Sequence, residues 1–104
     1  PVLHCDSTGV LWLFYAESVE CIRVAQPPTW EPGGDVKVIT CSNPPDCDTP
    51  NSWSRPRTIL KQSTDGIPKV IANKLVVLSS GEWVLPFWRE HPAADSCPHL
   101  ESVG

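Results

Sequence analysis

Five cysteines are the residues of this 104-residue sequence whose chemistry is easiest to name: Cys5, Cys21, Cys41, Cys47 and Cys97. Because five is an odd number, at least one of them cannot pair within the chain. Cys41 and Cys47 flank a proline-rich loop and could close it with a disulfide; alternatively, most of the five are free thiols that pack as small apolar groups. No pair has the CxxC spacing of a strong zinc motif, so no metal site is expected.

Three tryptophans, Trp12, Trp83 and Trp88, could stack against a sugar ring. They stand among Val, Leu and Phe in runs typical of strands, however, and this environment favours packing inside a core. His4 lies in a similar run, which favours a packed histidine over a ligand or a base. Tyr15 is the single tyrosine, and its apolar neighbours predict a packing role with a satisfied hydroxyl.

The elements that must position these side chains repeat within the chain. Residues 9–15 (GVLWLFY) and 81–87 (GEWVLPF) share a glycine followed by an apolar and aromatic run, 72 residues apart. Each follows a short apolar run and a small polar join. Glycine takes turn conformations that other residues adopt at a cost, so both segments predict β-hairpins. A repeated antiparallel unit that cannot bury both of its faces suggests a propeller or another repeat array.

The whole chain is expected to be all-β. Its 12 prolines rule out long helices across most of the sequence, and its apolar runs are short and rich in Val, Ile, Leu and aromatic residues. Strands are predicted at 2–5, 10–15, 36–41 and 58–60, with a further short strand at 21–24. We therefore expect one partial domain over 1–90, with a four-stranded blade at about 1–62 and the start of the next at about 67–90. Residues 91–104 are expected to form a loop or a disordered tail.

Charge and hydropathy narrow the class of protein. The net charge is −4 and the eight Lys and Arg residues are scattered, whereas nucleic-acid-binding proteins show a clustered basic face. No apolar run is long enough to span a membrane and no signal peptide is present. The sequence begins at Pro1 and contains no Met, which is expected of a fragment, a processed product or a partial gene model. A secreted or endomembrane location therefore stays open, and no cofactor is expected.

Residues 46–57 (DCDTPNSWSRPR) resemble the Asp-box of sialidases and their relatives, also called the bacterial neuraminidase repeat. The family pattern is Ser-x-Asp-x-Gly-x-Thr-Trp, and Asp48 and Trp53 stand at its Asp and Trp positions. Ser52 replaces the Thr, while Asp46 and Pro50 depart from the pattern at its Ser and Gly. Both hairpins also resemble the first strands of blades in this family. The resemblance implies a six-bladed propeller, of which this chain forms about one and a half blades and the remaining blades are its partners.

The resemblance also implies an exo-glycosidase that removes terminal sialic acid or a related sugar. Sialidases use a Tyr nucleophile assisted by a Glu, an acid/base carboxylate, and arginines that hold the substrate carboxylate by bidentate hydrogen bonds. In blade topology the ends of the second strands lie on the face opposite the Asp-boxes, where this family binds substrate. That face would carry Arg89 and Glu90 as catalytic residues, with Glu17 and Arg23 as substrate-binding residues.

Two alternatives to this interpretation stay open. A strand-end pair such as Arg89 and Glu90 could be a solvated rim, and the chain could belong to a non-catalytic carbohydrate-binding or structural propeller module. Asp48 and Trp53 are structural in every case, because the carboxylate can hold a turn and the indole can pack under a strand. The chain alone is expected to be inactive on sialosides and to expose Trp12, Trp83 or Phe87 where missing blades would cover them.

Overall fold

A four-stranded antiparallel sheet is the main layer of the computed structural model, which describes residues 1–19, 33–42 and 44–91. Its strands follow the order of the chain: β1 (Val2–Cys5), β2 (Leu11–Glu17), β3 (Asp35–Cys41) and β4 (Arg57–Leu60). Between β3 and β4 lie two single-turn 3-10 helices, η1 (Pro44–Asp46) and η2 (Pro50–Ser52). The described residues contain no α-helix, so the all-β prediction is confirmed.

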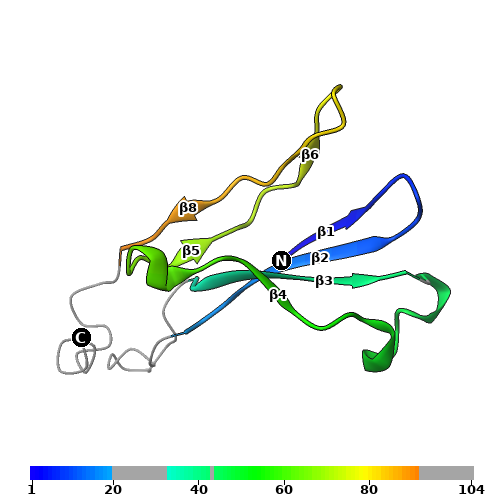
Figure 1. Ribbon diagram of the computed structural model, residues 1–104, viewed down its shortest axis with the longest axis horizontal. Helices are drawn as coiled ribbons and strands as arrows, with labels where there is room; N and C mark the ends of the chain where they lie inside the picture. Colours follow the sequence, from blue (N-terminus) through cyan, green and yellow to red (C-terminus); the bar gives the residue numbers. More distant parts are fainter. Residues whose placement is uncertain (20–32, 43, 92–104) are drawn as a thin grey trace.

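A long hairpin over residues 69–89, here called the ribbon, forms the second layer. It follows η3 (Gln62–Thr64) and rises above the sheet in Figure 1. Its base pairs β5 (Lys69–Val70) with β8 (Trp88–Arg89), and its outer part pairs β6 (Val76–Val77) with β7 (Trp83–Val84). Both predicted hairpins and the predicted strand at 36–41 are therefore confirmed. The predicted strand at 21–24 lies outside the described residues, as do residues 92–104 of the predicted tail.

The core lies between the sheet and the ribbon. Successive side chains of a strand point to opposite faces, and the register sets Phe14 opposite both Val2 and Val38 on one face. These three side chains are buried together with Val36 and with Ile71 of the ribbon. Because the sheet and the ribbon contribute to one buried cluster, the ribbon is held against this face by the removal of apolar surface from water.

The two hairpin turns have the same backbone structure. In the first turn the N–H of residue 6 donates to the carbonyl of residue 10 at 2.9 Å, and Gly9 N–H donates to the carbonyl of residue 6 at 3.1 Å. Both bonds recur 72 residues later, between residues 78 and 82 at 2.8 Å and from Gly81 to residue 78 at 2.9 Å. Gly9 and Gly81 take φ values of +90° and +92°, which glycine adopts without a steric cost. The sequence repeat is thus a repeat of structure.

Among the described residues, the large aromatic side chains that are exposed lie on the ribbon. Trp83 and Phe87 are 37% and 42% exposed, as expected. Trp12 is only half-buried rather than open, because its ring lies edge-on to Trp83 at a centroid distance of 4.9 Å and stacks with Phe14 at 6.3 Å. The indole of Trp12 therefore belongs to the contact between the sheet and the ribbon.

A pair of glycines joins the two layers. Gly34 and Lys69 exchange main-chain hydrogen bonds of 3.0 and 2.9 Å just before β3 begins. A Cβ atom on Gly33 would lie 2.3 Å from the carbonyl oxygen of Lys69, and one on Gly34 would lie 2.0 Å from that of Glu17. Only glycine fits so close to another backbone, so this pair brings the base of the ribbon to the ends of β2 and β3.

Candidate functional site

A cavity of about 410 Å³ opens beside the base of the ribbon and contains Arg89, one of the predicted site residues. Its walls come from β4, from the segment around η3, and from β5 and β8, which lie side by side in Figure 1. A turn at Gly66, with φ +78°, reverses the chain between η3 and β5. Strand pairing then sets Lys69 opposite Arg89. The lining is completed by Phe87, Asp65 and residues 58–61 and 64.

Lys69 and Asp65 form a charged pair inside this cavity. Lys69 is only 4% exposed, and its ammonium group donates to Asp65 Oδ1 and, at 3.1 Å, to the carbonyl oxygen of Lys61. Such partners are required when an ammonium group is buried. The Asp65 carboxylate also accepts a bond of 2.9 Å from the N–H of Ile67. The hydrogen bond from Lys69, followed by that from Ile67, lowers the pKa of Asp65, so this carboxylate is ionised at neutral pH.

Arg89 is the guanidinium group of this cavity, and its charge is only weakly engaged. Its Nε lies 3.7 Å from Asp65 Oδ2, a distance that gives an ion pair but no direct hydrogen bond. Its side chain is 59% exposed. The lining carries three cations, Lys61, Lys69 and Arg89, against the single carboxylate of Asp65. Because Lys69 already neutralises that carboxylate, the guanidinium of Arg89 can hold an anion such as a carboxylate through two parallel N–H bonds.

Glu90 and Glu17, which were also predicted on the substrate face, are not among the described residues that line this cavity. Glu90 follows Arg89 directly, and its Oε1 accepts a 3.1 Å bond from Trp88 Nε1. Glu17 ends β2, and its Oε1 accepts a 2.7 Å bond from Lys37, which raises the pKa of that lysine. The Glu17 carbonyl lies against the glycine junction, so Glu17 is at the same end of the sheet as Arg89. Arg23 lies outside the described residues.

A disulfide between Cys41 and Cys47 closes the loop that leads into the predicted Asp-box segment, residues 46–57. Trp53 is half-buried there, and its Nε1 donates to the carbonyl oxygen of Cys47 at 2.9 Å. Asp48 is exposed, and within the described part of the chain its carboxylate accepts no hydrogen bond. The sequence left open whether these cysteines form a disulfide or remain free thiols, and Cys41 and Cys47 form a disulfide. Cys5 is an exposed free thiol and not a packed one.

The Asp6 carboxylate holds the turn of the first hairpin. Its Oδ1 accepts bonds from the Thr8 N–H at 2.8 Å, the Thr8 hydroxyl at 2.7 Å and the Val10 N–H at 3.0 Å. Its Oδ2 accepts a 2.9 Å bond from Trp12 Nε1. The bonds from Thr8 and Trp12 hold the pKa of Asp6 well below its usual range. The turn-holding role that was expected of Asp48 is thus filled by Asp6, whose carboxylate also binds the Trp12 indole.

Sequence reasoning missed Asp65 and Lys69 as members of the charged cavity. Asp65 had a visible signal, because Thr64-Asp65-Gly66 predicts a turn, but a turn residue has no obvious charge partner. The four-residue spacing from Asp65 to Lys69 indicates an ion pair only on a helix. Here the contact forms because the chain reverses at Gly66 and the ribbon folds back on the sheet.

The chain was compared with protein families, curated proteins and solved structures. No protein-family model, no curated protein and no solved structure matches the chain. Among residues 1–19, 33–42 and 44–91, no helix has the length and apolar character needed to cross a membrane.

Proposed function

We propose that this chain is part of a sialidase-like exo-glycosidase, in which Arg89 binds the carboxylate of a terminal sialic acid or related acidic sugar. The observation that carries the proposal is the cavity at the base of the ribbon. It holds three cations and one carboxylate, although the chain as a whole has a net charge of −4. A guanidinium fork that is 59% exposed, beside an Asp65 carboxylate already paired with the buried Lys69, suits a planar carboxylate.

The repeat supports the propeller part of the proposal. A four-stranded antiparallel sheet is followed by a second hairpin with the same turn bonds, which is compatible with one blade and the start of the next. On this proposal residues 1–90 contribute one and a half blades. Further blades of the same propeller supply the Tyr nucleophile and the remaining arginines, while Glu90, Glu17 and Arg23 support Arg89 on the substrate face.

Binding by the chain tests the role of Arg89. The ¹⁵N-labelled chain is titrated with α-methyl sialoside and, separately, with the methyl ester of the same sugar, which lacks the charge. We expect the acid to shift the amide resonances of residues 61–70 and 87–90 and the ester to bind roughly tenfold more weakly, since hydrogen bonds to charged groups contribute most. Arg89→Lys should weaken acid binding, because an ammonium group does not copy the fork.

Arg55→Lys is the matched control, since Arg55 is exposed and does not line this cavity. Equal affinity for acid and ester, or equal weakening by the Arg55 and Arg89 variants, would contradict a carboxylate site at Arg89.

A non-catalytic carbohydrate-binding propeller module is the second candidate, and one observation favours it. Asp65 is the single acidic residue among the cavity-lining residues, and its carboxylate is engaged by Lys69. No general acid therefore stands in this part of the cavity. Binding of the sialoside without turnover by the longer protein would favour this module over the glycosidase.

A further inference from the structure

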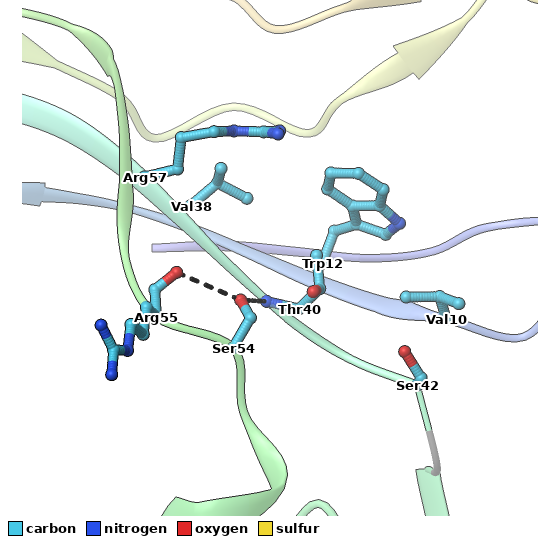
Figure 2. Close-up of a pocket in the computed structure, with 8 residues that line it drawn as sticks. All are labelled: Val10, Trp12, Val38, Thr40, Ser42, Ser54, Arg55 and Arg57. Atoms are coloured by element: carbon cyan, nitrogen blue, oxygen red, sulfur yellow. Dashed lines mark hydrogen bonds between the residues drawn. The ribbon is translucent and has the colours of Figure 1, made fainter.

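A second cavity, of about 420 Å³, lies at the opposite end of β3 from Arg89. Figure 2 shows its floor and walls: Val38 and Trp12 lie on the sheet face, and Arg57 of β4 extends over Val38 toward the indole. Thr40 and Ser42 contribute hydroxyl groups from the end of β3 and the residue after it. The cavity thus combines an aromatic ring, a guanidinium group and hydroxyl groups.

Arg57 has no counter-ion in the described part of the chain. It is exposed, forms no ion pair with a described residue, and no acidic residue lines the cavity. Within the described residues the hydroxyl groups of Thr40 and Ser42 also make no hydrogen bond. These donors and acceptors are available to a ligand. Arg55 also lines the cavity, but its side chain points away from Trp12 in Figure 2, so Arg57 is the guanidinium that extends toward the ring and selects a negatively charged ligand.

The remaining walls of the cavity are fixed by contacts already present. Asp6 Oδ2 holds the Trp12 indole N–H at 2.9 Å, which sets the orientation of the ring. Ser54 Oγ accepts a 2.9 Å bond from the Thr40 N–H and donates to the Arg55 carbonyl oxygen at 3.3 Å, both drawn in Figure 2. The bond between Thr40 and Ser54 ties the segment before β4 to the end of β3. A ligand would therefore meet a ring and a strand edge that need little reorganisation on binding.

We infer that this second cavity binds an acidic saccharide, with its carboxylate or sulfate on Arg57, its ring against Trp12, and its hydroxyls on Thr40 and Ser42. An aromatic face beside hydroxyl side chains suits a polar ring with C–H groups, whereas an acidic peptide would need only the charge. The site shares no residue with the Arg89 cavity, so it stands or falls independently of the proposed function.

The test is a titration of the ¹⁵N-labelled full chain with four probes. These are a chondroitin disaccharide that carries glucuronate, the same disaccharide with a sulfate on its amino sugar, neutral N-acetyllactosamine, and sodium sulfate. We expect both acidic disaccharides to shift the Trp12 indole resonance and the amides of residues 38–42 and 57. The neutral disaccharide should bind at least about tenfold more weakly, and sulfate alone should cause no saturable shift.

Two variants with the same change of charge separate the site from general electrostatics. Arg57→Gln should weaken binding of the acidic disaccharides at least about tenfold, whereas Arg55→Gln should weaken it by less than about threefold. Figure 2 shows the reason, because the Arg55 side chain points away from Trp12. Both arginines are exposed, so the folded spectrum should survive in each variant.

Several outcomes would overturn the proposal. They are no binding of either acidic disaccharide, equal weakening by both variants, equal affinity for the neutral disaccharide, and equal affinity for a poly-glutamate peptide. The last would assign the cavity to an acidic protein segment instead. Weaker binding of only one acidic disaccharide keeps the proposal and identifies whether carboxylate or sulfate is the recognised group.

Discussion

Removing the Cys41–Cys47 disulfide should destabilise the chain by an amount set by its loop. The two cysteines are 6 positions apart, and closing a loop of this size removes enough chain entropy from the unfolded state to stabilise the fold by about 2 kcal/mol. Cys47→Ser is the better variant, since Cys41 is fully buried and a hydroxyl there would lose its hydration. The bond from Trp53 to the Cys47 carbonyl uses the main chain and should persist.

The assay is equilibrium urea unfolding in a Cys5→Ser background, which removes the exposed free thiol. A loss of about 2 kcal/mol should lower the unfolding midpoint by about 1–2 M. Adding a reductant should bring the parent down to the stability of the Cys47→Ser variant and should change the variant less. Equal midpoints for parent and variant without reductant would refute the reasoning. Cys5→Ser alone should change the free energy of unfolding by less than about 0.5 kcal/mol.

Three other changes test the hairpin, the core and the proposed site. Asp6→Asn should lower Tm at neutral pH and flatten its acid dependence. Because the fold lowers the pKa of Asp6, its stabilisation is complete above an unfolded pKa of about 4 and is lost as pH falls toward the folded value; Tm recorded down to about pH 2 checks this, and an unchanged acid limb would count against it. Phe14→Ala should cost about 3–5 kcal/mol in urea unfolding and the exposed Phe87→Ala less than about 1 kcal/mol, so similar losses would contradict the assigned core. In the longer glycosidase that we propose, Arg89→Lys should impair turnover of a fluorogenic sialoside while Arg55→Lys should not; retained turnover would remove Arg89 from the site.

The elements that depend on local sequence could be predicted. The turns at Gly9 and Gly81 follow from glycine beside small polar residues, and β3 follows from its β-branched run. The contacts that form only when distant parts of the chain come together could not be predicted from the sequence. The Lys69–Asp65 pair depends on the ribbon returning to the sheet. Cys41 and Cys47 are recognisable as a possible pair because they flank a proline-rich loop, but the sequence did not decide between a disulfide and free thiols.

The support of the first turn was missed for a different reason. The pattern of an Asp-box directed attention to Asp48, whereas the Asp6 carboxylate reaches Trp12 only because a hairpin brings position 6 beside position 12. Hydrogen-bond geometry of this kind is a property of the turn and not of a spacing that can be read along the sequence.

The glycine junction gives the chain a mutational signature. At Gly33 and Gly34 the space for a side chain is occupied by main-chain oxygen atoms, of Lys69 and Glu17, which cannot adopt another rotamer. A substitution in the core can be compensated when neighbouring side chains repack, but a substitution at either of these glycines cannot. Any diverged descendant that keeps its ribbon on its sheet should therefore keep two consecutive glycines directly before β3. A search for distant relatives that is anchored on this pair, followed by an alternating β-branched strand, would tolerate divergence everywhere else.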